Sequence, residues 1–117
     1  MKWNFVLLVV AGLFSCGDKE AQLPENILSR NKMQHVIWDM TRSDELVNYQ
    51  ASMDTSINRK EKSVALYEQV FRIHKISEQD FRQSLAWYQK NPSQLKVVLD
   101  SVRNRSERLL PLQYSKP

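Results

Sequence analysis

Apolar residues recur every three or four positions along most of the chain, which is the spacing of one face of an α-helix. The pattern predicts a helix over about 30–51, a second over 59–75, a third that begins after Ser77 and a fourth from Pro92 to Pro111. No segment alternates apolar and polar residues as a half-buried strand does. The apolar positions of these helices are Met33, Val36, Ile37, Met40, Val47, Val64, Tyr67, Val70, Phe71, Phe81, Leu85, Tyr88, Leu95, Val98, Leu99, Val102 and Leu109.

Local signals mark the starts of the helices. Ser29 precedes the first helix and is a favoured N-cap residue. The stretch Ser77–Asp80 has the spacing of a capping box, with aspartate in the place of the preferred glutamate. Asn91–Pro92 combines an N-cap residue with a proline at the first helical position. Because the loops are short, neighbouring helices are expected to be antiparallel, and the sequence predicts an all-α fold, a compact bundle of about four helices.

The first fifteen residues have the layout of a secretory signal peptide. Lys2 is the only charged residue among them, and residues 5–14 form a continuous apolar run. A helix needs about 20 apolar residues to span a bilayer, so this run is too short to do so. Residues 13–16 (LFSC) follow, and they resemble the lipobox of bacterial lipoproteins, in which the cysteine becomes the lipidated first residue of the mature chain.

The only cysteine, Cys16, is therefore the predicted lipidation site. Leu13 and Ser15 fit the lipobox, whereas Phe14 is bulkier than the usual residue and is expected to slow processing. The alternative is a free cysteine beside a removed signal peptide. Lipidation at this position predicts a signal peptide over 1–15, a tether over 16–22, a helical domain over 23–110 and a tail over 111–117.

Composition narrows the classes of function. The 117 residues suit a single domain, since domains usually run to about 100–200 residues. Two glycines and four prolines are too few for a small β-sandwich or a glycine-rich phosphate loop. A single cysteine excludes an internal disulfide framework and a zinc site built on cysteine pairs. We therefore expect neither a cofactor nor a metal.

The net charge of +4 is unevenly distributed. Residues 16–58 carry −3 and residues 59–117 carry +6, with Arg103, Arg105 and Arg108 close together in the fourth predicted helix. A basic face can meet anionic lipid, an anionic glycan or an acidic partner, although a simply solvated face is the more frequent case. Nucleic acid is not an expected partner, because the sequence holds no recognition motif for it.

Three polar side chains are candidates for chemistry, and a structural role is favoured for each. Asp39 lies five residues from Asp44, so the two carboxylates point about 140° apart and are not expected to converge. Asp39 is expected to cap a helix or to pair with an arginine. His74 suits a role at the end of the second helix, and His35 is too distant in sequence to make a metal site with it. Ser84 has no sharp turn to present it as a nucleophile, so we expect it at a close helix contact.

Four aromatic residues allow two interpretations. Trp38, Trp87, Tyr67 and Tyr88 can line an aromatic groove, or they can pack in the core and at its rim. At helical spacing, core and rim packing is the more frequent outcome. We therefore expect packing, with the groove as the alternative.

Two segments and the helix before them resemble a known family. Residues 67–77 and 81–88, with Pro92 after them, resemble recurrent signatures of the Bacteroidota lipoprotein family known as domain of unknown function 4296. The resemblance covers about 23–109, and it implies an α-helical lipoprotein but no reaction. It departs at Lys75–Ile76, where the family is expected to have a glycine that ends the second helix. The residues of the first helix that fit are Met33, Val36, Ile37 and Asp39.

These patterns favour a non-enzymatic helical module that is tethered to a membrane through Cys16 and binds a protein or peptide of the cell envelope. The expected location is the outer membrane, on its periplasmic face or at the cell surface. A chaperone-like module that binds apolar peptides is the first alternative. An enzyme acting on an envelope glycan or lipid is the second, and it requires Asp39, His74 or Ser84 to converge with another polar group in a pocket.

Overall fold

The computed structural model describes residues 23–114, with side chains as far as Leu109. It contains four helices, α1 (Arg30–Met53), α2 (Arg59–Ile73), α3 (Glu78–Lys90) and α4 (Pro92–Tyr114), and the described residues hold no strand. The predicted all-α bundle of four helices is therefore confirmed.

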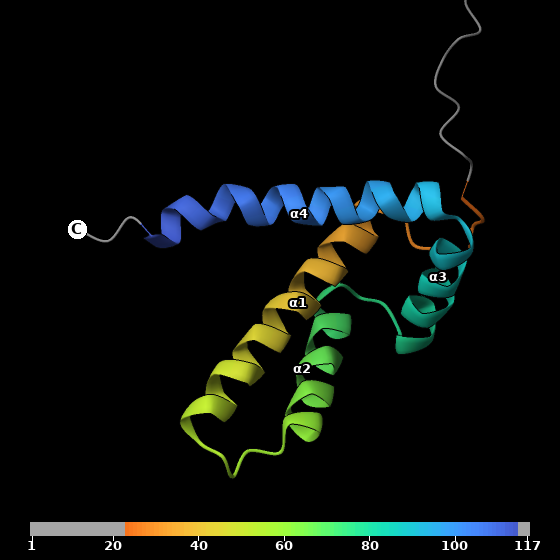
Figure 1. Ribbon diagram of the computed structural model, residues 1–117. Helices are drawn as coiled ribbons and strands as arrows, with labels where there is room; N and C mark the ends of the chain where they lie inside the picture. Colours follow the sequence, from red (N-terminus) through yellow and green to blue (C-terminus); the bar gives the residue numbers. More distant parts are fainter. Residues whose placement is uncertain (1–22, 115–117) are drawn as a thin grey trace, which may run out of the picture.

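Helix α1 is the central element of the fold. Figure 1 shows α1 and α2 as an antiparallel hairpin, while α4 crosses the first half of α1 and extends beyond it. Helix α3 packs against α4 close to the start of α4. The segment 23–28, which we call the lead-in, runs beside α3 before α1 begins, so that α1 has neighbours on several sides.

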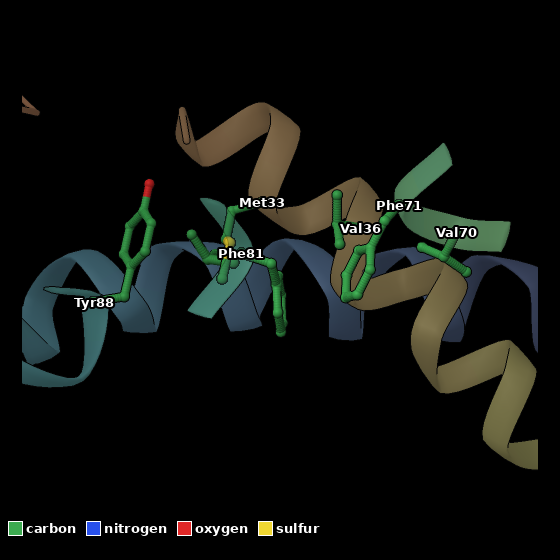
Figure 2. Close-up of a cluster of buried hydrophobic side chains, with 7 residues drawn as sticks. Met33, Val36, Val70, Phe71, Phe81 and Tyr88 are labelled. Atoms are coloured by element: carbon green, nitrogen blue, oxygen red, sulfur yellow. The ribbon is translucent and has the colours of Figure 1, made fainter. Parts of the chain in front are cut away.

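The core lies where α1, α2, α3 and α4 meet. Figure 2 shows Met33 of α1 near Phe81 of α3, and Val36 near Phe71 of α2. The rings of Phe71 and Phe81 are 5.5 Å apart between centroids, so α2 and α3 meet through aromatic contact. Three predicted apolar positions are not in the core, since Val64 is 49% exposed, Leu99 46% and Leu109 37%. The buried cluster consists of Met33, Val36, Val70, Phe71, Phe81, Tyr88 and Val98.

Local capping fixes the starts of the first three helices. The Ser29 hydroxyl accepts a hydrogen bond from the backbone N–H of Lys32, as predicted. The Ser77 and Asp80 side chains each accept from the other's backbone N–H, so the predicted capping box is confirmed. Asn58 caps α2 at the end of the expected loop, a cap that the sequence analysis did not assign.

The start of α4 corrects the predicted role of Asn91. Pro92 is the first helical residue, as expected, and the Asn91 carbonyl accepts from the backbone N–H groups of Gln94 and Leu95. The Asn91 side chain, however, donates to the carbonyl of Trp87. It therefore closes the end of α3 instead of capping α4, because that unpaired carbonyl lies within its reach.

Three predicted helix ends differ from the structure. Helix α1 continues two residues beyond 51, to Met53, and α2 ends at Ile73 with His74 as its cap. The prediction that Pro111 ends α4 is wrong, because the helix continues to Tyr114. The φ angle of proline is compatible with a helix, so the backbone can continue with one hydrogen bond fewer.

Helix α2 ends in a Schellman motif centred on Lys75. The N–H of Ile76 donates to the carbonyl of Phe71 over 3.0 Å, and the N–H of Lys75 donates to that of Arg72 over 3.2 Å. Lys75 has a φ of 55°, the left-handed conformation that favours glycine. The position where the family resemblance predicts a glycine therefore has the backbone geometry of one, although it holds a lysine.

Replacing Lys75 by glycine is expected to raise the free energy of unfolding by about 1 kcal/mol. The gain comes from removing a Cβ that is strained at positive φ, and the Lys75 side chain forms no hydrogen bond or ion pair with any described residue. Urea unfolding of wild type, Lys75→Gly and Lys75→Ala measures the effect. Alanine keeps the Cβ, so an equal gain from Lys75→Ala would contradict this explanation.

Candidate functional site

Two acidic residues of α1 pair with two residues of α2. Asp39 Oδ2 is 2.6 Å from Nε2 of His74, and the hydroxyl of Tyr67 donates to Asp44 Oδ1 over 2.5 Å. Each carboxylate has its own partner along the antiparallel hairpin, so the two do not converge on one point. Neither expected role of Asp39, a helix cap or an arginine partner, occurs among the described residues, because the end of α2 brings the His74 ring to it instead.

The hydrogen bond to Asp44 raises the pKa of Tyr67 to about 12, with partial burial and the carboxylate charge adding to the rise. The phenol therefore stays protonated through the neutral range and acts as a donor. Because the folded state holds this proton more tightly, the contribution to stability is present below about pH 10 and is lost as the pH rises toward 12. The Tyr67–Asp44 pair therefore links α1 to α2 at neutral pH.

The Asp39–His74 pair lies where α2 ends. His74 is the C-cap residue of α2, and its backbone carbonyl accepts from Lys32 Nζ over 3.1 Å. A carboxylate–histidine pair needs a nucleophile or substrate at the other ring nitrogen to act as a general base. No described residue forms a hydrogen bond with His74 Nδ1, so the pair does not extend to a triad among the described residues.

Ser84 and Tyr88 of α3 hold the lead-in by one residue. The Ser84 hydroxyl accepts from the backbone N–H of Leu28 over 2.9 Å, and the Tyr88 hydroxyl donates to the Leu28 carbonyl over 2.8 Å. Both side chains are fully buried. Burial raises the pKa of Tyr88, which keeps the phenol protonated as a donor. Ser84 therefore forms no hydrogen bond with Asp39 or His74, and together with Tyr88 it clamps the backbone of Leu28.

The three arginines of α4 do not form one basic face. Arg103 pairs with Glu107, and Arg108 donates to the carbonyl of Asn104. Arg105 instead turns toward α1, where Nη1 is 2.8 Å from Nδ1 of His35. Its guanidinium also lies 5.2 Å from the centre of the Trp38 ring. Arg105 therefore contributes to the α1–α4 contact, because its side chain is long enough to place the guanidinium over the ring of Trp38.

The predicted aromatic residues separate into packing and groove positions. Trp38 and Tyr88 are buried, and Trp87 packs edge-on against Tyr88 with centroids 5.1 Å apart. Tyr67 lines a groove that has a volume of about 380 Å³ and lies between α1, α2 and α3. We call it the α2–α3 groove. Its apolar lining consists of Met40, Val64, Tyr67, Phe71, Phe81 and Leu85.

Three charged residues border the α2–α3 groove. Glu78 and Arg82, which are one turn apart on α3, form an ion pair of 2.7 Å. Glu68 of α2 has no hydrogen-bond or ion-pair partner among the described residues. The groove thus combines an apolar wall with one carboxylate that is free to accept a hydrogen bond. Apolar spacing alone does not separate this wall from the core, and Phe71 and Phe81 belong to both. Val64 differs from the core residues because it is 49% exposed.

Residues 23–114 contain neither a cluster of metal ligands nor a membrane-spanning helix. No group of three or more histidine, aspartate or glutamate side chains suited to hold a metal ion occurs in this part of the chain. None of the four helices is long and apolar enough to cross a bilayer. Cys16, the predicted lipidation site, lies outside the described residues.

Comparison with known proteins gives one match. Residues 24–109 match the family model described as Domain of unknown function (DUF4296). No curated protein and no solved structure matches the chain. The family match spans the lead-in and all four helices as far as Leu109, so it includes the α2–α3 groove and the Leu28 clamp.

Proposed function

We propose, for a chain that belongs to the Domain of unknown function (DUF4296) family, a role as a lipid-anchored, non-enzymatic module that binds an envelope protein in the α2–α3 groove. The description of the family assigns no activity, so the proposal rests on the geometry of the groove and on the sequence around Cys16. The anchor keeps the domain at a membrane, and the groove supplies the contact with the partner.

The α2–α3 groove is the observation that carries this proposal. Six apolar side chains line it, and Val64 remains 49% exposed there although it belongs to the apolar face of α2. Covering exposed apolar area with a partner stabilises the complex by about 25 cal/mol per Å² of apolar surface buried. A volume of about 380 Å³ suits one or two inserted side chains better than a long apolar segment. This size favours a specific partner over the chaperone-like alternative.

Glu68 adds a polar requirement to the partner. Its carboxylate lies at the groove and is not engaged by any described residue. A partner that inserts an apolar side chain and presents a lysine or arginine beside it would gain both burial and a charge-assisted hydrogen bond. We therefore propose that the partner segment is apolar and basic.

The polar groups support a non-enzymatic role. Asp39 pairs with His74, whereas Ser84 is fully buried and bonds to the backbone of Leu28. An enzyme of the hydrolase type needs its nucleophile and base within hydrogen-bond reach of each other. These contacts separate the candidate nucleophile from the candidate base, so the geometry favours binding over catalysis.

A photo-crosslinking residue at position 64 tests the groove. We expect it to capture a discrete envelope protein in living cells, and we expect Glu68→Lys in the same chain to reduce the yield by repelling a basic partner. The same probe at Leu99, which is 46% exposed on α4 and does not line the groove, is the matched control. Equal yields from the two probe positions, or no effect of Glu68→Lys, would argue against the groove as the binding site.

A further inference from the structure

The lead-in joins the domain at a fixed place. Both backbone groups of Leu28 are bonded to buried side chains of α3, and the N–H of Ile27 donates to the carbonyl of Pro24 over 3.0 Å. Leu23, Ile27 and Leu28 also pack against the core. The chain is therefore held from Leu23 onward. The point where the tether joins the domain is fixed by these contacts, whatever conformation the tether adopts.

The tether limits how far this point can be from the lipid. Seven residues, 16–22, separate the start of the lead-in from the proposed lipid on Cys16. A fully extended chain spans about 3.5 Å per residue, so Leu23 lies within about 25 Å of Cys16. This inference rests on the proposed lipid anchor. With that anchor, the start of the lead-in stays within about 25 Å of the lipidated residue.

Two shallow hollows border the lead-in and share an amphipathic character. One is lined by Leu23, Arg30 and Val97 among others, and Val97 is 46% exposed. The other is lined by residues that include Trp87 and Lys90. Apolar, indole, cationic and neutral polar groups therefore occur together on this surface, which we call the lead-in face.

The charge of the lead-in face fits a phospholipid surface. Arg30 lines one hollow, where it also donates to Gln94 Oε1 over 2.9 Å, and Lys90 lines the other. The lead-in itself carries one acidic residue, Glu25. Basic side chains are attracted to lipid phosphates, and indole rings prefer the boundary between head groups and acyl chains. Trp87 is partly exposed, so its ring is accessible at this face.

We infer that the lead-in face rests against the membrane to which the chain is anchored, and that this contact orients the α2–α3 groove away from the lipid. Helix α3 supplies residues to both surfaces, and at 100° per residue its groove positions (Phe81, Leu85) and hollow positions (Gln83, Ala86) lie on roughly opposite sides. A domain that contacts lipid through one side of α3 leaves the other side open to a partner.

An environment-sensitive fluorophore on an introduced cysteine tests this orientation. Cys16 carries the lipid in the anchored protein, so Val97→Cys provides a single reactive thiol on the lead-in face. In vesicles of phosphatidylethanolamine and phosphatidylglycerol, we expect its emission to shift to the blue and to be quenched by nitroxide-labelled lipid. Val64→Cys, with nearly the same exposure in the free domain, is the matched control and is expected to keep the spectrum of a probe in water.

Flotation with the vesicles separates the two proposals. Protein that fails to float has no lipid anchor, which overturns the anchor and the orientation that depends on it. Protein that floats but gives the same spectrum at positions 97 and 64 overturns the orientation alone. Quenching of tryptophan fluorescence by brominated lipid provides a second readout, with the native side chain at position 97. The part of the quenching that is absent from Trp87→Phe belongs to Trp87.

Discussion

Truncating Tyr88 to alanine is expected to lower the free energy of unfolding by about 3–5 kcal/mol, the range for deleting a large buried aromatic side chain. Tyr88 is fully buried, packs edge-on with Trp87 and donates to the Leu28 carbonyl. The change therefore leaves a cavity in the core and removes one of the two bonds that hold the lead-in. Denaturant unfolding followed by circular dichroism measures the loss.

Two further variants separate packing from hydrogen bonding at this position. Tyr88→Phe keeps the ring and removes only the donor to Leu28, so its expected cost is about 1–3 kcal/mol. Tyr49→Ala is the surface control, because Tyr49 is 64% exposed, and its expected effect is within about 0.5 kcal/mol. A similar loss from Tyr88→Ala and Tyr49→Ala would contradict the place of Tyr88 in the core.

Replacing Cys16 by alanine is expected to abolish lipid attachment and to release the mature domain from the membrane fraction. The physical reason is that two or more acyl chains anchor a protein stably, whereas no helix in the described residues can cross a bilayer by itself. Labelling with radioactive palmitate, followed by fractionation of the cells, measures both losses. The folded domain should be unaffected, since Cys16 precedes the lead-in by seven residues.

The control for this experiment is wild-type protein made to the same level. Incorporation of equal label into wild type and Cys16→Ala would refute lipidation at this position. Phe14→Ala offers an independent measurement, because removing the bulky side chain beside the lipobox cysteine is expected to increase the processed fraction. If Phe14→Ala does not change the processed fraction, Phe14 does not slow processing. The lipid anchor is then tested by the palmitate labelling alone.

The helices could be predicted because their signals are local. The spacing of apolar residues places four helices, and Ser29 and the Ser77–Asp80 capping box mark two of their starts within one residue. Each of these signals involves residues three or four apart, which the helix itself brings together. Local signals failed at Asn91 and Pro111, where more than one backbone outcome is compatible with the same residues.

The groove and the clamp depend on contacts between distant residues. Ser84 meets Leu28 across 56 positions, and Arg105 meets His35 across 70. Val64 and Val70 both follow the apolar spacing of α2, yet Val70 is buried while Val64 faces the groove. Periodicity identifies the apolar face of a helix, but it does not say how much of that face a neighbouring helix covers.

The sequence by itself determined the helical fold class, the starts of the four helices and the family, and it predicts the lipid site at Cys16. Only the tertiary structure decided that Asp39 pairs with His74, that Ser84 and Tyr88 hold the lead-in, and that α2 and α3 leave an apolar groove. The physical reason is distance along the chain. Local backbone preferences depend on neighbouring residues, whereas the packing of four helices depends on the shapes of all their faces together.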